Sequence, residues 1–173
     1  RLLRTANQIA QAACVIHEAD ELLQRACDLI CEQYGFYYTG FFLIDENGDW
    51  AVLHAGYGEA GQKMLQAHHR LKVGGNSMVG AAIHLGEARI ALDVGAERIH
   101  FKNPLLPHTR SEIALPLRHD KETFGAMTVQ SVEEQAFSQD DITTLQTLAD
   151  LLATAVLHKK LRRRLHLAET ILQ

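Results

Sequence analysis

Polar side chains that could form a binding site gather where a loop leads into an apolar strand. They are supplied by one run of residues, His108, Thr109, Arg110, Ser111 and Glu112. An arginine can hold a phosphate or carboxylate through two parallel hydrogen bonds, and N–H groups at the start of a helix capped by Ser77 could hold its other side. The run therefore predicts contact with a nucleotide or small organic acid, or else a structural tether in which Arg110 pairs with Glu112 or Asp93.

Ten histidines are many for 173 residues, and several fall in segments expected around a pocket. A neutral imidazole can ligate haem iron or another metal. The chain has no His-x3-His or Cys-x2-Cys spacing, so the sequence predicts no metal site. Surface or hydrogen-bonded loop histidines are the simpler interpretation. If haem is bound, His100 or His108 is the expected axial ligand, because both lie on the loop expected to cover the pocket.

The cysteines are sparse, and all of them precede residue 32. Cys27 and Cys31 are four residues apart and share a helix face, and two thiols alone cannot complete a structural zinc site. They are predicted to be a buried apolar pair. Three cysteines without paired spacing suit a reducing, cytoplasmic setting. The net charge of -4 gives no general attraction for nucleic acid, and no apolar run approaches the roughly 20 residues of a membrane span.

Periodicity and turn signals indicate the elements that must position these residues. The first helix carries an apolar stripe at steps of three and four, and Asp20 is the expected N-cap of the second helix. Asn47-Gly48 predicts a hairpin turn, Ser138 is expected to cap the last helix, and Pro116 suits a strand edge or bulge. The remaining expected elements are strands at 36–45, 50–56, 70–73, 88–92, 111–118 and 123–132, helices at 59–69 and 78–86, and a connection at 93–109 with a helical turn near 96–101.

Strands joined by tight turns favour an antiparallel sheet. The terminal helices should cover one face, and the middle helix with the 93–110 connection should cover the other, above a small cavity. The last helix, about 34 residues or roughly 50 Å long, extends beyond the core and carries a seam-like apolar stripe, as the first helix does. This pattern predicts a homodimer through the terminal helices. The basic run at 158–166 is interpreted as a solvated coiled-coil flank, with nucleic acid or lipid headgroups as the alternative.

Four segments, "GNSMVGAAI", "RIALDVG", "FKNPLLPHTRSEIALPLR" and "FGAMTVQS…FSQDDITTLQTLADLLATAV", resemble the GAF domains of bacterial multi-sensor histidine kinases and related signalling proteins. The resemblance covers about residue 10 to residue 158. It implies an α+β fold, a GAF-like (PAS-related) α/β/α sandwich with a six-stranded antiparallel sheet and a pocket bounded by 76–112. It also implies a dimer helix bundle that passes a signal to an output domain in the same chain.

The domain organisation expected from this resemblance has three parts. Residues 1–16 form a dimerisation or linker helix, 17–158 the GAF domain, and 159–173 a connector to an output domain outside this sequence. The chain begins at Arg1 and not at Met, so a piece of a longer protein is expected.

The function expected at this point is that of a regulatory sensor and not of an enzyme. GAF relatives that reduce free methionine sulfoxide use pocket cysteines, and here 40–56 and 76–130 contain none, which also opposes a covalently attached bilin. The alternatives are a haem-based gas or redox sensor and a ligand-free dimerisation and relay module. No cofactor is required. The residues predicted to line the pocket are Phe42, Ile44, Trp50, Ser77, Met78, Asp93, His100, Phe101, Asn103, His108, Arg110 and Glu112.

Overall fold

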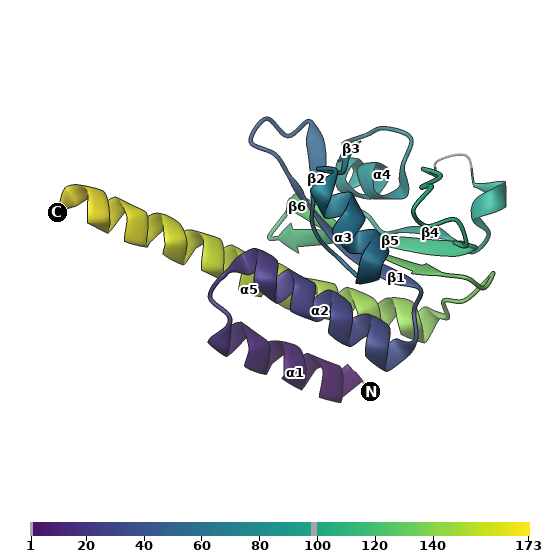
Figure 1. Cartoon of the computed structure of the whole chain (residues 1–173), viewed down its shortest axis with the longest axis horizontal. Coiled ribbons are helices and arrows are strands. Elements are labelled where there is room, and N and C mark those ends of the chain that lie inside the picture. Colours follow the sequence, from purple (N-terminus) through teal and green to yellow (C-terminus); the bar gives the residue numbers. More distant parts are fainter. Residues whose placement is uncertain (1, 98–99) are drawn as a thin grey trace.

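The computed structural model describes residues 2–97 and 100–173, and in these ranges helices cover both faces of one antiparallel sheet (Figure 1). The six strands follow the order β3-β2-β1-β6-β5-β4. This arrangement confirms the predicted α+β sandwich. The elements are α1 (Leu2–Val15), α2 (Ala19–Tyr34), β1 (Tyr38–Ile44), β2 (Trp50–Gly56), α3 (Gly58–Gln66), β3 (Arg70–Lys72), α4 (Met78–Leu85), β4 (Arg89–Ala91), the 3-10 turn η1 (Val94–Ala96), β5 (Ser111–His119), β6 (Glu122–Ser131) and α5 (Gln139–Leu172).

Two hairpins and one central pairing build the sheet. In the β1–β2 hairpin, Gly48 adopts a φ of 76°, which glycine reaches without steric cost. The β5–β6 hairpin pairs over nearly the full length of both strands, and β1 joins β6 to unite the two halves. Pro116 lies beyond the end of β4, where β5 is a free edge that needs no donor on that side.

The terminal helices α1, α2 and α5 lie together on one face of the sheet, as predicted (Figure 1). They bury a continuous apolar core against the strand residues that point toward them. That core includes Ile9, Leu22, Phe41, Ile113, Leu115, Leu148 and Leu152. Because side chains alternate between the two sides of a strand, this face uses every second residue of β1, β5 and β6.

Helix α5 is continuous from Gln139 to Leu172 and crosses the predicted boundary at residue 158 without a break. It starts with a capping box, in which Ser138 and Asp141 each bond the other's backbone N–H. Its side chains contribute to the core as far as Val156, and the C-terminal part projects away from the sheet (Figure 1). Among the residues that the structure describes, no helix is both long and apolar enough to cross a membrane.

Two local predictions need correction. Glu18 and not Asp20 is the N-cap of α2, because Asp20 lies in the first turn, where its carboxylate is 2.7 Å from Nδ1 of His54. The helical turn expected near 96–101 is found earlier in the chain, as a 3-10 turn at Val94–Ala96. It begins there because Asp93 caps it by accepting a hydrogen bond from the N–H of Gly95. Residues 98 and 99 of that expected turn lie outside the described ranges.

Helices α3 and α4 and the connection after η1 cover the opposite face of the sheet. Helix α3 sits directly on β2, because Gly61 has no side chain there: a Cβ atom would lie 2.1 Å from the carbonyl oxygen of Gly56. Ser77 caps α4, and its Oγ accepts from the N–H of Gly80 at 2.9 Å. These packed helices leave space over the middle of the sheet.

Candidate functional site

A small cavity lies between the sheet and the cover formed by α3, α4 and residues 100–110 of the connection between η1 and β5. Its volume is about 30 Å³, enough for one or two water molecules and too small for a metabolite. The floor is a row of polar side chains across three strands, because Tyr38 of β1 pairs with Gln130 of β6, which pairs with Glu112 of β5. The lining consists of Tyr38, Phe42, Met64, His69, Leu71, Met78, Val79, Phe101, Asn103, Leu106, Glu112, Thr128 and Gln130.

Glu112 is the buried carboxylate of this floor, and it is only 6% exposed. Its Oε2 accepts from the hydroxyl of Thr128 at 2.5 Å and from Nε2 of Gln130 at 3.2 Å. Its Oε1 lies 3.2 Å from Nδ1 of His100. Among the described residues no lysine or arginine forms an ion pair with Glu112, although burial of a carboxylate is costly unless it is paired or hydrogen-bonded.

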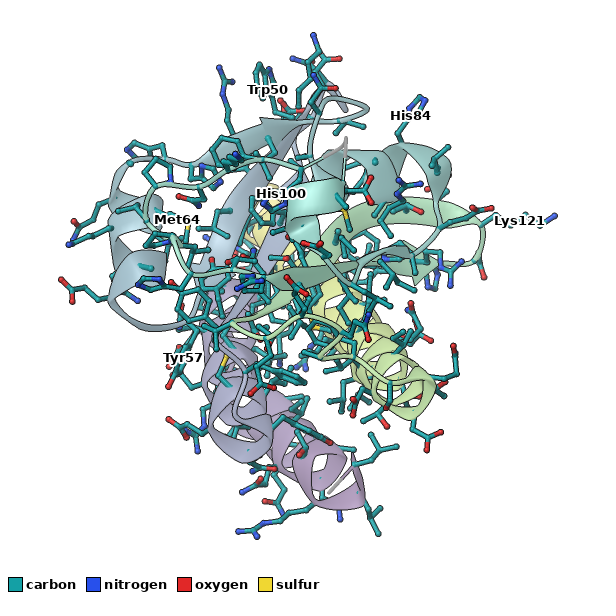
Figure 2. All side chains as sticks on the ribbon, turned by 90° about the vertical axis from the view of Figure 1, so that its right-hand side faces the viewer. Trp50, Tyr57, Met64, His84, His100 and Lys121 are labelled. Carbon is teal, nitrogen blue, oxygen red and sulfur yellow. The ribbon has the colours of Figure 1, made fainter. Side chains whose placement is uncertain are left out.

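His100 lies over the middle of the sheet, whereas Trp50 and Lys121 lie at its rim (Figure 2). Its side chain is 9% exposed. The distance to Glu112 is that of an ion pair, and Nδ1 of His100 has no hydrogen-bond partner among the described residues. The attraction between the two groups therefore depends on whether the imidazole carries a proton.

The connection is attached to the floor at a second point. The hydroxyl of Thr109 donates to Oε1 of Gln130 at 2.7 Å. Gln130 thus contacts the connection through its carbonyl oxygen and Glu112 through its amide nitrogen. Movement of the connection would disturb the same hydrogen-bond network that holds Glu112.

The walls of the cavity are apolar and aromatic. The ring of His69 lies 5.8 Å from that of Phe42 and 5.6 Å from that of Phe101. Burial lowers the pKa of His69, which favours the neutral imidazole. Burial raises the pKa of Tyr38, whose hydroxyl is therefore neutral and has no hydrogen-bond partner among the described residues. On the α3 side (Figure 2), Met64 accepts a bond from Nδ2 of Asn103 at 3.0 Å through its sulfur.

A larger hollow of about 400 Å³ lies on the outer side of the connection. Asn103 and Leu106 line both this hollow and the inner cavity, so their side chains separate the two. His100 lines the outer hollow while its ring approaches Glu112. Displacement of this thin wall would join the two spaces into one of metabolite size.

Five of the twelve residues predicted from the sequence line the inner cavity: Phe42, Met78, Phe101, Asn103 and Glu112. His100 lies beside it. Ile44 is partly buried on the same face but outside the lining, and Trp50 packs under the guanidinium of Arg70 at 3.8 Å. Ser77 and Asp93 act as helix caps, and exposed His108 lies 6.3 Å from the ring of Tyr37.

Arg110 is exposed and pairs with Glu134, not with Glu112 or Asp93 as the tether interpretation predicted. The backbone N–H of Arg110 donates to the backbone carbonyl of Ser131 at 2.8 Å, which places Arg110 beside the loop that leads to α5. Glu112 instead faces the cavity, which explains why the two do not meet. Arg110 is thus part of a tether, but its partner lies on another loop.

Eight lining residues were missed: Tyr38, Met64, His69, Leu71, Val79, Leu106, Thr128 and Gln130. Two of them had a readable signal. Thr128 and Gln130 alternate with buried Met127 and Val129, and polar side chains at every second position of a buried strand mark a second, polar face. The others required knowledge of how α3 and the connection fold over the sheet.

The thiols lie away from this cavity. Cys27 belongs to the core on the helix face, which confirms the predicted burial. Cys31 is also buried; its Sγ lies 3.3 Å from Oγ1 of Thr39, and burial raises its pKa to about 12. Cys14 is exposed on α1. Within the described ranges, no three His, Cys, Asp or Glu side chains gather as a metal site.

Solved structures with the same fold include enzymes as well as regulatory domains. The GAF domain of a phosphoenolpyruvate-protein phosphotransferase from Coxiella burnetii has a TM-score of 0.83, 21% identity, and coverage of 94% of this chain and 96% of that one. A free methionine-R-sulfoxide reductase from Neisseria meningitidis, in complex with its substrate, has a TM-score of 0.81, 24% identity and coverage of 93% and 91%. A type II reductase from Thermoplasma acidophilum has a TM-score of 0.69, 26% identity and coverage of 80% and 92%.

These reductases overturn the prediction that the chain is not an enzyme, because a domain of this fold and 26% identity carries catalysis. That prediction rested on the resemblance to sensor domains and on the missing pocket cysteines. The comparison with curated proteins gives no significant match. The GAF domain model matches residues 16–156, which is most of the chain. From the sheet order, the covered cavity and this match together, the chain belongs to the GAF domain family.

Proposed function

We propose that this GAF domain is a sensory module whose cavity binds a small cationic ligand anchored by Glu112. A GAF domain supports a sensory or regulatory role in general. The observation that carries the finer proposal is a carboxylate, 6% exposed, that faces the cavity with no lysine or arginine paired to it among the described residues. A ligand cation at this carboxylate would gain from the low dielectric of the site.

In the closed domain, His100 occupies the position of that cation. A protonated amine at Oε1 of Glu112 would compete with the imidazole, which lies 3.2 Å away. Binding therefore requires the side chain of His100 to turn away from Glu112 and the wall at Asn103 and Leu106 to open toward the outer hollow. This movement costs free energy, so only a fraction of the molecules is open at any time. The apparent affinity is the affinity of the open form multiplied by that fraction.

The strand that carries Glu112 also contacts the start of α5. The hydroxyl of Ser111 donates to the carbonyl of Glu133 at 2.6 Å, and Arg110 pairs with Glu134, a few residues before the cap at Ser138. A ligand that shifts the start of β5 would thus also shift the loop that leads into α5. For this to be a signal, the ligand must bind one arrangement of α5 better than another.

We also propose that the projecting part of α5 pairs with a second copy of the chain and leads to an output domain. Leu161, Leu165 and Leu172 are all more than half exposed, at spacings typical of a helix seam. Sedimentation equilibrium should give a dimer for the chain and a monomer for the double variant Leu161→Glu and Leu165→Glu. A monomer at all concentrations for the unchanged chain would contradict this part of the proposal.

The ligand proposal is tested with small amines by thermal shift and isothermal titration calorimetry. Glu112→Gln keeps the size and the acceptor for Thr128 but removes the charge, and should abolish binding of any cation. Glu122→Gln changes an exposed carboxylate at the start of β6, makes the same charge change and should bind normally. Equal binding by both variants would contradict the proposal.

A second candidate function is reduction of free methionine-R-sulfoxide, which the likeness to the reductases favours. The sulfoxide also carries an amine that Glu112 could hold. Incubation of the protein with the sulfoxide and dithiothreitol, followed by measurement of methionine, tests it. Turnover lost in Glu112→Gln and retained in Glu122→Gln would assign catalysis to this cavity.

A further inference from the structure

We propose that the cationic ligand of this cavity is a methylated ammonium, such as a choline-type trimethylammonium group, and not a primary amine. The inference rests on the proposed function, because it assumes that Glu112 anchors a cation. The hydrogen-bond acceptors and the walls around the carboxylate indicate which class of cation fits there.

Several hydrogen-bond acceptors of the cavity are already used. A primary ammonium has three N–H donors, and each one buried without an acceptor is destabilising. Oε2 of Glu112 already accepts two bonds, the carbonyl oxygen of Gln130 accepts from Thr109, and that of Asn103 accepts from the N–H of Leu105 at 2.9 Å.

Acceptors that stay open among the described lining residues include Oε1 of Glu112, the hydroxyl oxygen of Tyr38 and one ring nitrogen of the neutral His69. A primary ammonium must place its three N–H groups on such acceptors at the same time. A trimethylammonium group has no N–H to satisfy, so its charge alone must be balanced, and one carboxylate does so.

The walls supply what methyl groups on a cation require. The aromatic rings of Tyr38, Phe42 and Phe101 line the cavity, and the neutral imidazole of His69 lies between the last two. The polarisable sulfur of Met64 lies beside them. An aromatic cage with one carboxylate is the chemistry that recognises quaternary ammonium ions through cation–π attraction.

The same walls disfavour a primary ammonium for a second reason. A compact ammonium is strongly hydrated and must lose that water in an apolar cavity. A trimethylammonium group spreads its charge over methyl groups that pack against apolar side chains, so it loses less. Recognition is thus predicted to increase with each N-methyl group.

The test compares choline with ethanolamine, which share one skeleton and differ only in three N-methyl groups. Calorimetry with the full chain should show choline binding about tenfold more tightly. Tetramethylammonium, which lacks the hydroxyl, should also bind. Phe101→Leu should weaken choline several-fold and leave ethanolamine nearly unchanged, because it removes a ring and keeps an apolar wall. Glu112→Gln should abolish both.

The outcomes separate the two proposals. Tighter binding of ethanolamine, sensitive to Glu112→Gln, overturns the methylated class and leaves the cationic ligand intact. Equal loss of both compounds in Phe101→Leu shows that the ring only shapes the wall, and also overturns it. If neither compound nor any other amine binds, both proposals fail.

Discussion

The two faces of the central sheet are built from the same strands but for different purposes. On β5, Ile113 and Leu115 point to the helices, whereas Glu112 and Ala114 point to the cavity. On the helix face, large apolar side chains fill the space between sheet and helices. On the cavity face, a polar row and small side chains leave a hollow. Alternation along a strand thus lets one segment stabilise the fold and form a site.

The comparison implies that stability and recognition can be changed separately. The helix face should tolerate truncation poorly, because close-packed cores relax only partly around a lost side chain. The cavity face should be sensitive to changes in hydrogen bonding around Glu112, because a buried polar group left without its partner is costly.

The largest effect is expected on the helix face. Leu115→Ala removes a fully buried side chain and should lower the free energy of unfolding by about 2–5 kcal/mol. Urea denaturation measures it, with Ile90→Ala as the control, because Ile90 is exposed on the edge strand β4. Amine binding at temperatures where the variant is folded should stay unchanged. A loss below about 1 kcal/mol would show that the faces do not differ as described.

A smaller loss is expected on the cavity face. Thr128→Val replaces the hydroxyl that donates to Glu112 at 2.5 Å and should cost about 1–3 kcal/mol, because the carboxylate loses a donor without a change of shape. Thr128→Ser keeps the hydroxyl and should restore most of the stability. In a Glu112→Gln background the cost of Thr128→Val should shrink, and a double-mutant cycle measures that coupling. An unchanged cost would show that the hydroxyl acts on something other than this carboxylate.

The sequence predicted the helix face better than the cavity face. Apolar periodicity is set by local spacing, so the stripes of α1 and α5 and the strands with their turns were predictable residue by residue. Cys27 and Cys31 were placed in the core for the same reason. The cap of α5 at Ser138 followed from residue type alone.

The cavity depends on contacts between segments far apart in the chain, which single-sequence patterns do not encode. Met64 and His69 reach the site only because Gly61 lets α3 lie on β2. Arg110 was predicted to face the site, but strand alternation gives no information on a residue that precedes its strand. The pairing with Glu134 depends on a loop that no local rule predicts.

A third prediction concerns the histidine that closes the site. His100→Asn removes the imidazole that competes for Glu112 and should increase the affinity for amines, up to roughly tenfold, because less energy is needed to open the connection. Titration calorimetry with the amine that stabilises the unchanged chain most measures it. His108→Asn, on the same connection but exposed, is the matched control. Weaker binding in His100→Asn would indicate that the imidazole contacts the ligand instead of competing with it.

The smallest predicted effect is the pH dependence that His69 gives to the cavity face. Burial lowers the pKa of His69 below its ordinary value of 6.5, so the unfolded chain binds the proton more readily than the folded one. The contribution of the neutral imidazole is thus fully present above pH 6.5 and is lost as the pH falls below it. In His69→Phe, urea denaturation should show a smaller loss of stability between pH 7.5 and 5.5 than in the unchanged chain. If His69→Phe keeps the pH dependence of the unchanged chain, the ring does not titrate differently on folding, and the neutral imidazole of the proposed cage loses its support.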